Sequence, residues 1–193
     1  RMAVKTLPIE NPDGVNVGHL IPAKGLTTFD KVLTDDDQVV RIRLEERQVM
    51  LQTRHAEVSS RPVEGAFPRY DAGIPQEFAL VATFARDEII SGLRRAAILT
   101  SEASRSVRMQ FDEAGVVMTA RAVDVGEATV SLDARIEGSP IEVAFNPEFL
   151  VEGIKAMDAE NITLKISGRD TPAIVEGEEN FIYVVMPVTR RAG

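Results

Sequence analysis

The sequence predicts an α+β fold in which helices cover one face of antiparallel sheets. Three observations favour it. A strand followed by a helix and then several strands recurs three times along the 193 residues. The segments read as strands alternate apolar and polar residues or form β-branched runs, and the segments read as helices carry apolar residues at helical spacing. Repeated strand-helix-strands units imply antiparallel sheets with the helices segregated to one face.

The first unit is expected between residues 17 and 63. Pro22 marks the start of its helix, because proline is favoured at the first helical position. Leu26, Phe29 and Val32 then form an apolar stripe. The predicted elements are a strand at 17–21, a helix at 22–33, and strands at 40–44, 49–53 and 57–63.

The second unit spans residues 78 to 136. Ile89, Ile90 and Leu93 give its helix an apolar face, and Gly115 ends a hairpin loop where a left-handed residue is wanted. The predicted elements are a strand at 78–84, a helix at 86–99, and strands at 107–111, 116–121 and 128–136.

The third unit starts with a strand at 141–145. Asn146 is suited to cap the following helix, and Pro147 falls at its first position. Phe149 and Ile154 belong to the apolar stripe of this helix. Further strands are predicted at 162–166, 173–175 and 181–188.

The last strand is unusual because an apolar run lies almost at the end of the chain. A segment so rich in β-branched and aromatic residues should pair in a sheet, and Pro187 should break it. Met186, an adaptable side chain beside a rigid proline, suits a shallow hydrophobic docking site for a partner. From these residues alone, the alternative is a final core strand.

Composition excludes several classes of protein. Hydrophobic residues make up 44% and charged residues 27%, which is typical of a globular chain, and no apolar run is long enough to span a membrane. The absence of cysteine excludes disulfides, thiol catalysis and cysteine-bound metal, and fits a cytoplasmic protein. The net charge of −8 argues against tight nucleic-acid binding by the chain as a whole. Because the first residue is Arg1, we expect a fragment or processed product.

Catalytic and metal-binding patterns are nearly absent. His19 and His55 fall on predicted strands without the spacing of metal ligands. The acidic run 35–37 offers oxygen ligands, but such a turn is more often simply solvated. No glycine-rich phosphate loop occurs. We therefore expect no enzyme activity, no cofactor and no metal.

Five stretches together resemble the bacterial sliding clamp, the beta subunit of DNA polymerase III. They keep that family's order and spacing across essentially the whole chain. They are Ile21-Pro22-Ala23-Lys24-Gly25, Gly65-Ala66-Phe67-Pro68-Arg69-Tyr70, Arg95-Ala96-Ala97-Ile98-Leu99-Thr100, Phe145-Asn146-Pro147 and Tyr183-Val184-Val185-Met186-Pro187. The resemblance implies the DNA-clamp fold, with residues 1–75 as the second half of the middle domain and 76–193 as the C-terminal domain. Residues 73–75 are the expected linker.

The resemblance implies a processivity factor that encircles double-stranded DNA and slides on it. Its partners would be DNA polymerase III, the clamp loader and other proteins with a clamp-binding motif, and the full-length protein would form a homodimeric ring. Partner peptides would bind an apolar groove. Carried over by position, its residues are Arg1, Met2, Pro68, Val184, Val185, Met186, Pro187 and Val188.

The ring also needs a DNA-facing lumen and a seam between protomers. The resemblance places basic helix residues toward DNA phosphates, and the candidates are Lys24, Lys31, Arg94, Arg95 and Lys155. Solvated helix faces are the alternative from the residues alone. The seam candidates are Ile98 and Leu99, together with Val107 and Met109 on a strand expected to be a sheet edge. Two other functions stay open, a stand-alone peptide-binding module and a small hydrolase.

Overall fold

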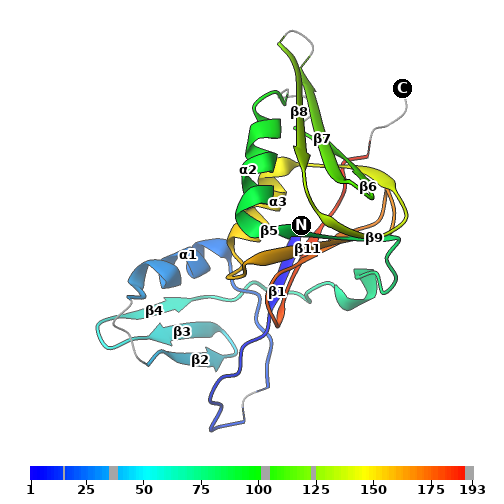
Figure 1. Ribbon diagram of the computed structural model, residues 1–193. Helices are drawn as coiled ribbons and strands as arrows, with labels where there is room; N and C mark the ends of the chain where they lie inside the picture. Colours follow the sequence, from blue (N-terminus) through cyan, green and yellow to red (C-terminus); the bar gives the residue numbers. More distant parts are fainter. Residues whose placement is uncertain (15, 35–38, 101–104, 123–124, 190–193) are drawn as a thin grey trace. The chain divides into compact units, whose positions relative to one another are not determined.

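A computed structural model describes residues 1–14, 16–34, 39–100, 105–122 and 125–189. The chain divides into two compact units, a larger one of residues 1–7 and 70–193 and a smaller one of residues 8–69. Each unit is described by itself below (Figure 1).

The larger unit contains two antiparallel sheets. The first has the order β1-β13-β12-β11-β5-β9 and the second has the order β10-β6-β7-β8. The strands of the first sheet are β1 (Met2–Lys5), β5 (Leu80–Ala85), β9 (Arg135–Gly138), β11 (Asn161–Ile166), β12 (Ala173–Glu176) and β13 (Phe181–Val185). Those of the second are β6 (Val107–Asp112), β7 (Gly115–Ala122), β8 (Gly126–Leu132) and β10 (Ile141–Phe145).

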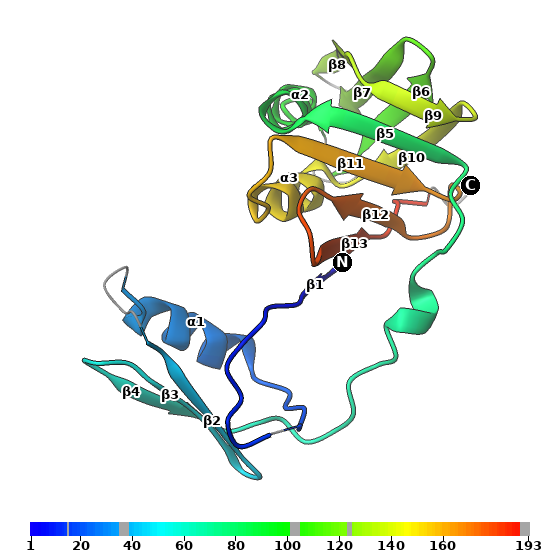
Figure 2. The same ribbon diagram turned by 60° about the horizontal axis from the view of Figure 1, so that its bottom comes forward.

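Two helices, α2 (Arg86–Ala97) and α3 (Pro147–Lys155), lie side by side in this unit (Figures 1 and 2). Ile89 and Leu93 of α2 and Leu150 and Ile154 of α3 are buried in one continuous apolar core. That core also takes the inward side chains of both sheets, such as Phe111 of β6. The predicted α+β layout, with helices on one face of antiparallel sheets, is therefore confirmed.

Local signals in the sequence fix two of these elements. The side chain of Asn146 accepts a hydrogen bond of 2.9 Å from the Glu148 amide, and Pro147 is the first residue of α3, so the predicted cap forms. Gly115 has φ +130° at the turn between β6 and β7, as the hairpin requires.

The smaller unit has one helix and one sheet. Helix α1 (Ala23–Val32) accompanies β2 (Arg41–Glu45), β3 (Gln48–Gln52) and β4 (Glu57–Ser60), in the order β2-β3-β4. Its buried core consists of Phe29, Val49 and Leu51. The unit thus buries few apolar side chains, while others, such as Ile42, are exposed.

Several predicted strands differ in the structure. The strand expected at 17–21 does not form, and only Leu20 bridges to Val63. The strand expected at 128–136 is divided into β8 and β9, because these two segments pair in different sheets. The last strand ends at Val185, before Pro187, since proline cannot donate to a ladder. Strand β1 was not predicted.

Candidate functional site

The two ends of the larger unit meet in one sheet. Strand β1 pairs antiparallel with β13, with Met2 opposite Val184 and Lys5 opposite Phe181. Figure 2 shows β1 beside β13. This long-range pairing brings Arg1 and Met2 next to the C-terminal run, while their part in a peptide groove stays a prediction. In the sequence, the apolar residues Met2 and Val4 on alternate positions are the signal that could have indicated this strand.

The tail beyond β13 leaves that sheet and reaches the second one. The Val188 amide donates a 2.7 Å hydrogen bond to the Ala144 carbonyl on β10. Met186 is 49% exposed and Val188 is 37% exposed. Together with Met2 on β1 and Arg1 just before it, these two side chains define what we call the tail surface.

Three of the predicted groove residues do not line this surface. Val184 and Val185 are buried in β13, because β1 and β12 flank that strand and its side chains pack against the unit. Pro187 is also buried. Their side chains are therefore not exposed at the tail surface, and their part in a groove stays a prediction. Pro68 is exposed and belongs to the smaller unit, so its part in a groove stays a prediction.

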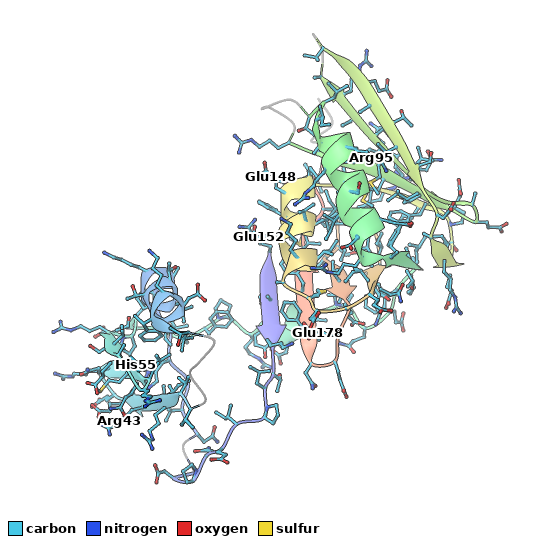
Figure 3. The ribbon with its side chains drawn as sticks, turned by 60° about the vertical axis from the view of Figure 1, so that its left-hand side comes forward. Arg43, His55, Arg95, Glu148, Glu152 and Glu178 are labelled. Atoms are coloured by element: carbon cyan, nitrogen blue, oxygen red, sulfur yellow. The ribbon has the colours of Figure 1, made fainter. Side chains whose placement is uncertain are left out.

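Helix α3 holds Arg1 at one end of the tail surface. The Arg1 guanidinium lies over the Phe149 ring, 4.1 Å from the ring centroid, and its Nη1 is 2.9 Å from Oε2 of Glu152. Figure 3 labels Glu152 on this helix, near β1. The Tyr183 hydroxyl donates a 2.8 Å hydrogen bond to the Phe149 carbonyl. Burial raises the pKa of Tyr183, and the nearby Arg1 charge opposes that effect.

A second contact anchors the other end of β1. The Lys5 ammonium is 2.7 Å from a Glu178 carboxylate oxygen and lies 5.3 Å from the centroid of the Phe181 ring. The hydrogen bond from Lys5 lowers the pKa of Glu178. Both ends of β1 are therefore tied by side chains as well as by the sheet.

The predicted DNA-facing residues are all exposed. Arg94 and Arg95 lie on α2 and Lys155 on α3, so these neighbouring helices bring the three cations to one layer of the larger unit. Lys24 and Lys31 lie on α1 in the smaller unit.

Arg95 has acidic neighbours. It borders a cavity of about 580 Å³ whose lining includes Asp87, Glu88, Asp112 and Asp133. Four acidic residues therefore share this cavity with Arg95. Sequence reasoning missed Arg86, which donates to the Lys155 carbonyl at 3.4 Å and so joins the start of α2 to the end of α3.

The seam prediction is partly wrong. Ile98 is 77% exposed just beyond α2, and Leu99 is half-buried. Val107 and Met109 are fully buried, and their strand β6 lies between β10 and β7. They therefore cannot form a free edge, because both sides of β6 are already paired. Within the described residues, the outer strand next to β7 is β8.

The remaining candidates carry no visible site. His19 lies outside any strand, and His55 lies in the turn before β4, where its amide donates to the Thr53 hydroxyl. The acidic run 35–37 lies outside the described residues. Among the residues that the structure describes, no group of three or more His, Cys, Asp or Glu is arranged to hold a metal, and no helix is long and apolar enough to cross a membrane.

Comparison with known proteins identifies the family. The model of the C-terminal domain of the DNA polymerase III beta subunit matches residues 72–189, and that of its central domain matches residues 1–69. This chain belongs to the DNA polymerase III beta subunit family. The two matched domains follow one another directly and together span nearly the whole chain.

Named relatives agree with this assignment. The chain is 31% identical to the beta sliding clamp of Streptomyces coelicolor over 192 residues, covering 93% of this chain and 50% of that protein. It is 29% identical to the beta sliding clamp of Vibrio cholerae over 171 residues, covering 88% of this chain and 47% of that protein. The chain thus spans about half the length of the relatives it matches.

Solved structures of the family share the fold. The beta subunit of DNA polymerase III from Thermotoga maritima superposes with a TM-score of 0.88 at 26% identity, covering 98% of this chain and 52% of that one. The sliding clamp of Bacillus subtilis superposes with a TM-score of 0.93 at 22% identity, covering 98% and 51%. The predicted clamp fold is therefore confirmed.

Proposed function

We propose that this chain is part of a sliding clamp, a non-catalytic protein that keeps DNA polymerase III on DNA. The consecutive match to two domains of the beta subunit family carries the proposal. Residues 1–75 would be the second half of the middle domain and residues 76–193 the C-terminal domain. The protein would act in the bacterial cytoplasm as a homodimeric ring around double-stranded DNA, placed there by a clamp loader.

Partner proteins would bind at the tail surface. Met186 and Val188 expose apolar side chains beside a paired strand, and methionine adapts to differently shaped aliphatic or aromatic anchors. A short extended peptide with such anchors is the ligand that this surface fits. One shared surface would then serve polymerase and other partners in turn.

DNA would be held by enclosure and weak attraction. The exposed cations of α2 and α3 supply a modest, sequence-blind attraction to phosphates, while the net charge of −8 disfavours binding elsewhere on the molecule. A ring that must slide gains nothing from contacts with base edges.

Peptide titration tests the groove. A fluorescent peptide ending in a Gln-x-x-Leu-x-Phe-type sequence should bind the chain, and Met186→Ala should weaken that binding. Val125→Ala is the control. Val125 is also an exposed apolar residue, at 71%, but it lies at the turn before β8 and is not part of the tail surface. If the peptide fails to bind, or binds equally to Met186→Ala, the proposed groove is refuted.

The ring is tested separately. Sedimentation of the full-length parent protein should give the mass of a dimer at micromolar concentration. A monomer that still binds the peptide would favour the alternative, a stand-alone peptide-binding module.

A further inference from the structure

We infer that Met186 is a site of reversible oxidation by peroxide, and that its sulfoxide form releases partner peptides from the tail surface. The inference rests on the proposed peptide binding. It adds a chemical modification that controls when the surface is open to partners.

The first step is that the fold exposes one methionine and shields the others. All six methionines lie in the described part of the chain, and Met186 is exposed to solvent. The other five are half-buried or fully buried, and they are Met2, Met50, Met109, Met118 and Met157. An oxidant in solution must reach the sulfur atom of a thioether, so Met186 should react first.

The second step is that the composition leaves few competing groups. The sequence contains no cysteine and no tryptophan, so no thiol of this chain consumes the oxidant. Methionine sulfur is soft and polarizable. The exposed thioether of Met186 is therefore the group on this chain that peroxide should oxidise most readily.

The third step is that the fold does not depend on the Met186 side chain. Strand β13 ends at Val185, so Met186 stands just outside the ladder that β13 forms with β1 and β12. Pro187 is buried, and the Val188 amide bonds to the Ala144 carbonyl, so the backbone is fixed directly after Met186. Oxidation should then leave the fold intact, and the sulfoxide stays within reach of a reductase.

The reaction transfers one oxygen atom. The Sδ atom of Met186 attacks hydrogen peroxide, an S–O bond forms as the O–O bond breaks, and the remaining oxygen leaves as water after a proton shift. Sulfur loses two electrons and the peroxide gains them. A methionine sulfoxide reductase reverses the change with the two electrons of a dithiol, which becomes a disulfide, and the oxygen again leaves as water.

The sulfoxide should oppose the docking of apolar peptide anchors. Its oxygen is a polar hydrogen-bond acceptor that water satisfies while Met186 is exposed. An aliphatic or aromatic anchor removes that water and offers no donor in exchange, which makes burial of the group unfavourable. We expect peptide affinity to fall about tenfold, in keeping with the cost of burying one unsatisfied polar group.

Peptide mapping by mass spectrometry tests the selectivity. After limited treatment of the full chain with hydrogen peroxide, Met186 should carry an added oxygen before any other methionine does, with the circular dichroism spectrum unchanged. Earlier oxidation of the half-buried Met2 or Met50 would overturn the inference.

Fluorescence anisotropy tests the effect on binding, with a methionine-free peptide of the Gln-x-x-Leu-x-Phe type and with the peroxide removed. Affinity should fall about tenfold as Met186 is converted. Methionine sulfoxide reductases for both sulfoxide epimers should restore it. Met186→Leu should keep its own untreated affinity after peroxide, because leucine has no sulfur. Met50→Leu is the matched control and should lose affinity as the unmodified chain does.

The outcomes distinguish this inference from the proposed function. Unchanged affinity after complete oxidation of Met186 would refute the switch alone, as would an equal peroxide-induced loss in Met186→Leu. Absence of any binding by the untreated chain would instead refute the proposed function itself.

Discussion

The aromatic ring of Tyr183 lies directly against the backbone of Gly153. A Cβ atom at Gly153 would overlap the ring carbons, so α3 can approach β13 this closely only because residue 153 is glycine. The same tyrosine reaches one turn back along the helix and donates to the Phe149 carbonyl. This contact sets the height of α3 over the sheet and, through it, the place of Phe149 and Glu152 beside Arg1.

Gly153→Ala should therefore destabilise the larger unit. Overpacking against the Tyr183 ring outweighs the gain in helix propensity, and we expect the free energy of unfolding to fall by about 1–2 kcal/mol. Urea denaturation followed by circular dichroism measures it. Gly73→Ala is the control, because a Cβ there meets no atom within 4 Å and the backbone is not left-handed. Equal stability of both variants would contradict the contact.

Tyr183→Phe should change the response of stability to alkaline pH. The fold raises the pKa of Tyr183 above its ordinary value of 10.0 by burial, so the folded state holds this proton more tightly than the unfolded state. The stabilisation is complete below about pH 10 and is lost as the pH rises through the raised value. Thermal unfolding measured from about pH 8 to about pH 11 brackets the ordinary tyrosine pKa. Over this range the melting temperature of the unmodified chain should fall more steeply than that of Tyr183→Phe.

At neutral pH the same variant tests the hydrogen bond. Loss of the bond to the Phe149 carbonyl should cost about 0.5–1.5 kcal/mol of unfolding free energy. Suppose instead that Tyr183→Phe is as stable as the unmodified chain at pH 7 and loses stability equally at alkaline pH. Tyr183 would then be responsible neither for a stabilising hydrogen bond nor for the alkaline loss of stability.

The two parts of the seam prediction should separate experimentally. Met109→Ala should lower the free energy of unfolding by about 2–5 kcal/mol, because the side chain is fully buried in the core. Ile98→Glu should change stability by only about 0.5 kcal/mol, because Ile98 is exposed, yet it should weaken dimerisation of the full-length protein. Chemical denaturation and analytical ultracentrifugation measure these two effects. A stable but monomeric Met109→Ala protein would restore β6 as an interface strand.

Removal of a proposed DNA-facing charge should alter the salt dependence of DNA binding. In the full-length protein, Lys155→Gln should reduce the slope of log affinity against log salt by about 0.9, the value for one phosphate contact. Arg95→Gln should have a smaller effect, because acidic side chains border the same cavity as Arg95. Lys165→Gln is the control. The ammonium of Lys165 on β11 lies 2.6 Å from a carboxylate oxygen of Glu176 on β12, so we expect its removal to leave the slope unchanged. Anisotropy with a short duplex gives the slopes, and equal slopes for Lys155→Gln and the control would count against the lumen assignment.

Local signals explain which elements were predictable. The apolar stripes of α2 and α3, the Asn146 cap and the Gly115 turn all depend on residues close together in the chain, and each forms as expected. The strand expected at 17–21 does not form because, within the described residues, this segment pairs through a single bridge, between Leu20 and Val63. Strand β1 escaped notice because four residues with a weak alternation carry little signal without their partner strand.

Amino-acid patterns were sufficient to establish the repeated units, the α+β class and the family resemblance, because periodicity and motif spacing are properties of neighbouring residues. The solvent exposure of individual side chains depends on the tertiary structure, which buries Val185, Pro187 and Met109 and leaves Met186 exposed. Folding also brought Arg1 to Glu152 from the far end of the chain. Strand neighbours and exposure follow from long-range packing, which no local pattern encodes.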